Sequence, residues 1–141
     1  MKSTMLTLIT ALVLAGCGWN GSGSPDPYAL LPGKWGWEGS DDCKVAPEVI
    51  SFSGDRKRMY IALSPVREDG GREPRRLAEY RILRETPAGL EMSLTGETRT
   101  NDAGQPVTWT LVLMSREKYC WQRSDWGAGC TRPLQRCAVK G

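Results

Sequence analysis

Five cysteines are the side chains of this sequence with the widest choice of chemistry, since a thiol can form a disulfide, bind zinc or catalyse redox exchange. Four of them lie in the body of the chain, at Cys43, Cys120, Cys130 and Cys137. None of these four forms a C-x-x-C pair, the spacing typical of zinc knuckles and thiol-exchange enzymes. The spacing therefore favours two disulfides over a metal site or a redox pair.

These four cysteines allow three pairings, and in each of them Cys43 joins a cysteine near the end of the chain. The other bridge then closes a short local loop. A bridge across so long a loop removes roughly 4 to 5 kcal/mol of unfolded-chain entropy. We therefore expect the beginning of the folded part to be tied to its end.

The fifth cysteine, Cys17, ends a segment of a different kind. A basic Lys2 and an apolar stretch over residues 5–13, too short to span a bilayer as a helix, are typical of an export signal. The sequence Leu14-Ala15-Gly16-Cys17 resembles the lipobox of bacterial lipoproteins. In that family signal peptidase II removes the leader, and the cysteine carries a diacylglyceryl group and an acyl chain such as palmitate. An ordinary secretory signal ending in a chance cysteine, or an apolar N-terminal helix, is the alternative.

Three regions of the chain follow from this resemblance. Residues 1–16 are the expected signal peptide, residues 17–27 the lipidated N-terminus with a Gly/Ser/Pro-rich flexible tether, and residues 28–141 a single β-barrel domain. The lipid on Cys17 makes a membrane the first expected partner. Gly18, rather than an aspartate, follows Cys17, which by resemblance to enterobacterial lipoproteins implies the outer membrane, with the protein facing the periplasm. An oxidising compartment also favours the two disulfides.

Several function classes are disfavoured by what the sequence lacks. The chain has no histidine, which excludes Ser-His-Asp and Cys-His catalysis and most catalytic zinc sites. No phosphate-binding glycine loop or EF-hand motif occurs, so no cofactor is expected. A net charge of +3 gives no reason to expect nucleic acid. Short carboxylates in expected loops keep a carboxylate-based hydrolase as the least favoured alternative: Asp41, Asp42, Asp102 and Asp125.

Tryptophan is the most informative binding residue of this chain, which holds six tryptophans and one phenylalanine. Tryptophan, tyrosine and arginine dominate the energetics of protein interfaces. Arg123, Asp125 and Trp126 form the densest such group, in a Gly-rich segment pinned by cysteines, and are the candidate partner-binding residues. Four other tryptophans lie on apolar faces and are expected in the core: Trp35, Trp37, Trp109 and Trp121.

The elements that must position the cysteine and tryptophan side chains show alternation of apolar and polar residues along most of the expected folded part. It predicts seven strands, over residues 33–39, 48–53, 58–64, 78–83, 90–97, 107–114 and 119–123. Leu83 breaks the alternation of its strand. A loop is expected over residues 65–74, and one helical turn over residues 132–136 of the cysteine-pinned C-terminal segment. The fold class is therefore all-β, a small antiparallel meander barrel of about seven or eight strands, with a sandwich as the alternative.

The segment Gly33-Lys34-Trp35 resembles the opening of the first strand in lipocalin-like (calycin) barrels. In those barrels the tryptophan of the Gly-x-Trp motif packs against a basic residue from the last strand. By position, the resemblance implies Arg123 for that role. The resemblance concerns architecture, because a second Thr-Asp-Tyr-like motif and a long helix are missing from this sequence.

Together these features predict a membrane-anchored envelope lipoprotein that acts as a non-catalytic binding module in the periplasm, with an envelope protein or an apolar ligand as its partner. One alternative is an inhibitor of a host hydrolase, because small barrel lipoproteins that block lysozyme are similar in size and anchoring. Residues 53–57 lack the tyrosine of those inhibitors' Ser-Gly-x-x-Tyr segment. The other alternative, a lipocalin-like carrier of an apolar ligand, requires a void lined by Trp35, Trp109 and Trp121.

Overall fold

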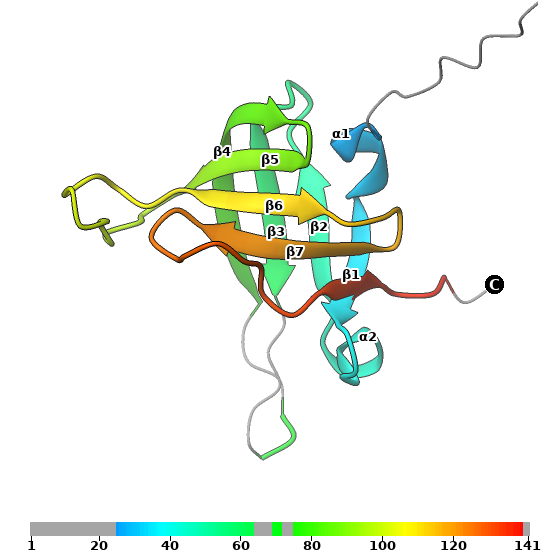
Figure 1. The fold of residues 1–141 in the computed structure, drawn as a ribbon. Helices are drawn as coiled ribbons and strands as arrows, with labels where there is room; N and C mark the ends of the chain where they lie inside the picture. The colour runs from blue at the N-terminus through cyan, green and yellow to red at the C-terminus, as the bar shows by residue number, and fades with distance from the viewer. Residues whose placement is uncertain (1–24, 64–68, 72–74, 140–141) are drawn as a thin grey trace, which may run out of the picture.

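Eight antiparallel strands close into one barrel in sequence order (Figure 1). The computed structural model describes residues 25–63, 69–71 and 75–139. Most of the expected loop over residues 65–74, and the expected signal, Cys17 and most of the tether, lie outside the described residues. Closure confirms the meander barrel and excludes the sandwich. The strands are β1 (Gly33–Trp37), β2 (Glu48–Phe52), β3 (Arg58–Leu63), β4 (Arg76–Thr86), β5 (Gly89–Leu94), β6 (Trp109–Leu113), β7 (Lys118–Arg123) and β8 (Leu134–Arg136).

The last strand, β8, replaces the helical turn that the sequence predicted over residues 132–136. It pairs with β1 and with β7, and so closes the barrel. Without it both neighbours would expose unpaired backbone groups along their edges. Leu134 points inward and is fully buried. Closure of the sheet therefore overrides the weak local preference for a turn of helix.

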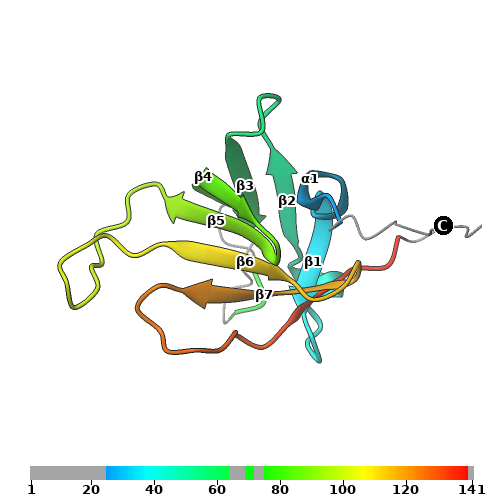
Figure 2. The same ribbon diagram turned by 45° about the horizontal axis from the view of Figure 1, so that its top comes forward.

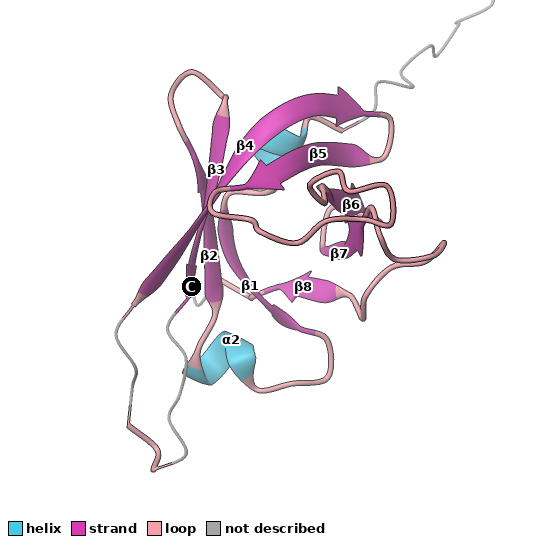
Figure 3. Ribbon diagram, turned by 90° about the vertical axis from the view of Figure 1, so that its left-hand side faces the viewer, coloured by secondary structure: helices cyan, strands magenta, loops and turns pink. Residues whose placement is uncertain are grey.

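Two short helices flank β1. Helix α1 (Pro27–Leu30) is capped by Asp26, whose carboxylate accepts a hydrogen bond from the backbone N–H of Tyr28. Helix α2 (Asp42–Val45) lies between β1 and β2 at the opposite end of the barrel (Figure 3). Across the described residues, no helix has the length and apolar character needed to cross a membrane. We call the two ends of the barrel the α1 end and the α2 end, after the helix that lies at each.

Strand register explains which side chains fill the interior. Alternate residues of every strand point inward, and the largest fully buried ones include Trp35, Tyr119, Met59, Met92 and Leu111. Leu83, the residue that broke the sequence alternation, lies at a β-bulge between Ile82 and Arg84 and is 44% exposed. The bulge absorbs one extra residue, and the side chains of β4 that pack on the core, Ala78, Tyr80 and Ile82, all precede it.

A basic side chain packs on Trp35, as the resemblance to calycin barrels implied, but it belongs to Arg136 rather than to Arg123. The guanidinium carbon of Arg136 lies 4.4 Å from the centroid of the indole ring, and Arg136 also donates hydrogen bonds to the backbone carbonyls of Leu30 and Pro32. Arg136 is the register partner of Trp35, because β8 lies next to β1. Arg123 is paired with Trp109 instead. The sequence assignment was wrong because β8 was not recognised as a strand.

Two disulfides complete the fold. Cys43 of α2 pairs with Cys137, 94 residues away, and Cys120 of β7 pairs with Cys130, 10 residues away. The first bridge ties the beginning of the barrel to its end, as expected from the cysteine spacing. The second closes the connection between β7 and β8. This connection and the one between β5 and β6 project side by side, on the left in Figure 2. In the meander they leave the same end of the barrel as the β1–β2 connection that contains α2.

Candidate binding surface at the α2 end of the barrel

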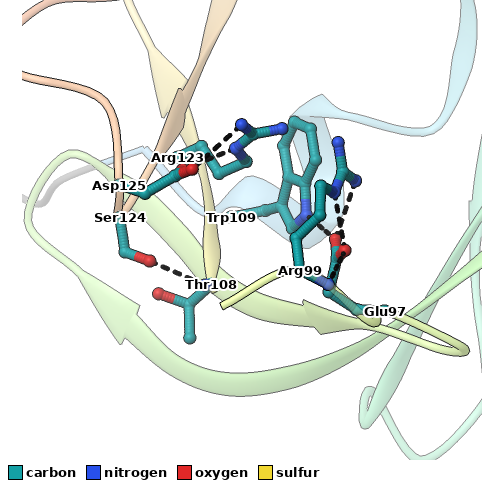
Figure 4. A network of polar contacts seen from close by, with 7 residues as sticks. All are labelled: Glu97, Arg99, Thr108, Trp109, Arg123, Ser124 and Asp125. Atoms are coloured by element: carbon teal, nitrogen blue, oxygen red, sulfur yellow. Dashed lines mark hydrogen bonds and ion pairs between the residues drawn. The ribbon is translucent and has the colours of Figure 1, made fainter. Parts of the chain in front are cut away.

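A cluster of charged and aromatic side chains gathers where the β5–β6 and β7–β8 connections meet. Trp109 is the first residue of β6 and Arg123 the last residue of β7, and the two are register partners. The β5–β6 connection adds Glu97 and Arg99 to this pair. The β7–β8 connection adds Asp125 and Trp126. Figure 4 shows Glu97, Arg99, Trp109, Arg123 and Asp125.

Arginine and tryptophan side chains alternate through this cluster. The guanidinium carbons of Arg99 and Arg123 lie 5.3 Å and 5.4 Å from the ring centroid of Trp109, one on either side of it (Figure 4). Arg123 also lies 4.8 Å from the ring centroid of Trp126. We call these four side chains the arginine–tryptophan stack. Each cation–π contact contributes about 0.5–2 kcal/mol, so the four side chains hold one another in place.

Each arginine of the stack is neutralised by its own carboxylate. Arg99 donates two hydrogen bonds to Glu97, of 2.7 and 2.8 Å, and the indole N–H of Trp109 donates a third to the same carboxylate, at 3.0 Å. Arg123 donates two to Asp125, of 2.6 and 3.0 Å. The surface therefore carries fixed charges that sum to zero.

These contacts also set the ionisation of the two carboxyl groups. Hydrogen bonds from Arg99 lower the pKa of Glu97 to about 2, although partial desolvation opposes them. Hydrogen bonding to Arg123 lowers the pKa of Asp125 as well. Both groups stay ionised at neutral pH, and a carboxylate held in this way is a poor general acid or base. The cluster is therefore suited to recognition.

Trp126 is the exposed aromatic member of the stack. It is 39% exposed, whereas the side chain of Arg123 beneath it is only 15% exposed. The segment that carries Trp126 is closed by the Cys120–Cys130 bridge and by two hydrogen bonds between Thr131 and the backbone of Trp121. An exposed indole on a fixed support can bind a partner at a low cost in ordering entropy.

The structure places the three candidate residues in contact, as their closeness in the chain suggested. The sequence did not predict Glu97 and Arg99 as members of this cluster. They belong to the β5–β6 connection, more than 20 residues upstream of Arg123. Trp109 was expected in the core. It packs against the core, yet it also supports the surface stack. A Glu-x-Arg pair in the same connection as an expected turn was the only sequence signal for the missed residues.

A continuous series of aromatic rings fills the barrel interior. Ring centroids are 4.8 Å apart between Trp35 and Tyr119, 5.9 Å between Tyr119 and Trp121, and 5.9 Å between Trp121 and Trp109. Trp35 and Tyr119 have no accessible surface, and Trp121 has 7%. The carrier alternative required these tryptophans to line a void, so the packing does not favour it.

Three of the four loop carboxylates considered for acid–base chemistry are engaged locally. Asp41 pairs with Lys44 at 3.7 Å, Asp42 accepts a hydrogen bond from Ser40 at 2.7 Å, and Asp125 pairs with Arg123. Asp102 lies exposed in a turn of the β5–β6 connection. Within the part of the chain that the structure describes, no group of three or more acidic or cysteine side chains could hold a metal ion.

One carboxyl group inside the barrel was not anticipated. Glu48 of β2 is the register partner of Trp35 and accepts a hydrogen bond of 3.3 Å from the hydroxyl of Tyr119. Burial raises its pKa to about 6, with a smaller contribution from the charge of Asp42. The hydrogen bond from Tyr119 opposes this rise. Its hydrogen-bond partner is a tyrosine, so Glu48 is a partly buried polar residue rather than half of an acid–base pair.

Comparison with known proteins supplies no function for this surface. No family model, curated protein or solved structure matches the chain. The surface around Trp126 is therefore interpreted through the chemistry of its own residues.

Proposed function

We propose that this protein is a lipid-anchored envelope protein, facing the periplasm from the outer membrane, and that its barrel acts as a non-catalytic binding module. The observation that carries the proposal is the exposed Trp126 on a stack of arginine and tryptophan side chains closed by a disulfide. Trp and Arg are enriched among the residues that contribute most to binding, and a rigid support reduces the entropy lost when a partner binds.

The polar groups of the same surface support binding over catalysis. Glu97 and Asp125 each use both oxygens on arginine, which leaves neither of them placed to exchange a proton with a substrate. The whole chain contains no histidine that could take that role. Inhibition of a host hydrolase would be one form of such binding. The identity of the captured partner distinguishes inhibition of a hydrolase from binding to an envelope protein.

The anchor is tested by lipid labelling. Cells that express the wild-type chain or Cys17→Ser are grown with radioactive palmitate, and the protein is recovered from separated inner and outer membranes. We expect label on the wild-type chain in the outer membrane and no label on Cys17→Ser, because the thiol is the site of lipid attachment. Label retained after this substitution would refute lipidation at Cys17. Labelled protein found only in the inner membrane would refute the outer-membrane assignment.

The binding surface is tested by site-specific photo-crosslinking in intact cells. A benzoylphenylalanine replaces Trp126 in one variant and Met114, which is 55% exposed on the β6–β7 connection, in the control variant. We expect a discrete adduct from position 126 that is absent from position 114. Identical adducts from both positions, or none from position 126, would contradict a binding role for this surface.

A further inference from the structure

A shallow groove of about 370 Å³ runs along the outer face of the barrel beside Trp126. Four strands form its floor, and the β7–β8 connection forms its wall. We call it the Trp126 groove. The residues that matter for its chemistry are Arg84, Glu91, Thr110, Gln122, Ser124 and Trp126.

Strand register aligns the floor of the Trp126 groove into one polar row. Arg84 of β4 pairs with Glu91 of β5, Glu91 with Thr110 of β6, and Thr110 with Gln122 of β7. Neighbouring strands lie about 4.8 Å apart, so the row from Arg84 to Gln122 extends about 14 Å. That length suits a chain of a few linked rings rather than a single small molecule.

Much of the hydrogen-bonding capacity of this row is unused inside the protein. Among the described residues, the hydroxyl of Thr110 and the amide of Gln122 make no side-chain hydrogen bond. Arg84 donates its Nε–H to Glu91 at 2.5 Å, and this pair leaves two guanidinium nitrogens and one carboxylate oxygen for a ligand. The row therefore offers both donors and acceptors along its length.

Trp126 adds an apolar surface at the end of the polar row. Part of its ring is covered by Arg123, and its remaining exposed surface borders the groove. The charges around the groove cancel in pairs, Arg84 with Glu91 and Arg123 with Asp125. Such a groove attracts neither a polyanion nor a polycation by long-range electrostatics.

We infer that the Trp126 groove binds a neutral oligosaccharide, an inference that rests on the proposed function of this surface and names its ligand. A sugar ring presents C–H groups on its faces and hydroxyl groups around its edge. The faces match an exposed indole, and the hydroxyls match a row of amide, hydroxyl, carboxylate and guanidinium groups. A phosphorylated ligand or an acidic peptide would need a net positive surface, which the paired charges do not provide.

The test is a titration of the full-length lipidated protein in detergent with three probes: the β-1,4-linked N-acetylglucosamine trimer, cellotriose and maltotriose. Calorimetry measures affinity, and tryptophan fluorescence reports on the exposed indole. We expect at least one trisaccharide to bind, and Trp126→Ala to weaken that binding about tenfold, as for the loss of one aromatic contact. Gln122→Ala and Thr110→Val, which remove hydrogen-bonding groups from the groove floor, should also weaken it.

Two exposed apolar residues outside the groove provide matched controls. Leu77→Ala and Met114→Ala remove side chains that are 64% and 55% exposed, and both should leave sugar affinity unchanged. Thermal unfolding of each variant verifies that it folds. If Trp126→Ala does not fold, Trp126→Phe, which keeps a smaller aromatic ring, replaces it in the titration.

Failure of the inference is distinguishable from failure of the proposed function. If none of the three trisaccharides binds, or if binding is unchanged by Trp126→Ala and Gln122→Ala, the sugar site is refuted. A discrete protein adduct from photo-crosslinking at position 126 would in that case leave the binding function intact.

Discussion

Glu48 places a partly buried carboxyl group among the apolar and aromatic side chains that line the barrel. Its pKa rises from a usual value of about 4.5 to about 6 because burial penalises the charged form. The folded state therefore binds a proton more tightly than the unfolded chain does. The stabilisation from this group is fully present below about pH 4.5 and is lost as the pH rises through about 6.

Replacing Glu48 by glutamine should therefore stabilise the protein at neutral pH. The amide removes the buried charge and still accepts the hydrogen bond from Tyr119. At pH 7.5 we expect the free energy of unfolding in urea to rise by about 1–2 kcal/mol, and its pH dependence between pH 4.5 and 7 to flatten. Asp102→Asn, at an exposed turn, is the control and should change little. A Glu48→Gln variant less stable than wild type at pH 7.5 would contradict the burial argument.

Arg123 tests whether the arginine–tryptophan stack depends on a planar guanidinium. Lysine keeps the charge but cannot form two parallel hydrogen bonds with Asp125 or stack flat between Trp109 and Trp126. We expect Arg123→Lys to lower the free energy of unfolding by roughly 0.5–2 kcal/mol and to increase the mobility of the Trp126 indole in fluorescence anisotropy. Arg116→Lys, exposed on the β6–β7 connection, is the matched control. Unchanged anisotropy in Arg123→Lys would show that the stack does not hold Trp126.

At the scale of elements, β8 decides the closure of the barrel although it is only three residues long. Its one inward apolar side chain, Leu134, is fully buried and faces Trp37 of β1 and Tyr119 of β7 across the register. We expect Leu134→Ala to lower the free energy of unfolding by about 2–5 kcal/mol, measured in urea, because the cavity lies where the sheet closes. Val139→Ala, 91% exposed just beyond β8, should have no effect. A loss below 1 kcal/mol would mean that β8 contributes little to closure.

The alternation of residue types predicted β1 to β7 with boundaries that differ from the structure by a few residues. It placed β2 and β3 to within one residue. In β5 the fully buried Leu90 and Met92 alternate with Glu91 and Ser93, as the pattern predicted. It missed the C-terminal part of β4, which runs on to Thr86, because the bulge at Leu83 shifts the pattern by one residue. Strand ends depend on where the partner strand stops, and no single segment contains that information.

For the whole molecule, the two disulfides have separate roles. The Cys43–Cys137 bridge closes a long loop that contains β2 to β8, whereas the Cys120–Cys130 bridge closes only the segment that carries Trp126. In the chain-entropy model the long bridge contributes about 5 kcal/mol to stability and the short one about 3 kcal/mol. Stability should therefore depend more on the first, and binding at the Trp126 surface more on the second.

Paired serine variants test this separation. We expect Cys43→Ser with Cys137→Ser to lower the urea midpoint more than Cys120→Ser with Cys130→Ser does. The second pair should reduce crosslinking from position 126 while the first pair leaves it close to wild type, measured under conditions where both are folded. Equal losses of crosslinking in the two pairs would refute a local role for the Cys120–Cys130 bridge.

The sequence by itself determined the features that depend on near neighbours or on counting. Alternation of apolar and polar residues predicted an all-β meander. An even set of four cysteines required Cys43 to pair with a cysteine in the C-terminal region. Arg123, Asp125 and Trp126 are close together in the chain itself. Only the tertiary structure decided which distant residues meet: Arg136 rather than Arg123 on Trp35, Glu97 and Arg99 beside Trp109, and the polar row across β4 to β7. The physical reason is that register across strands is set by closing the barrel, and closure depends on all eight strands at once.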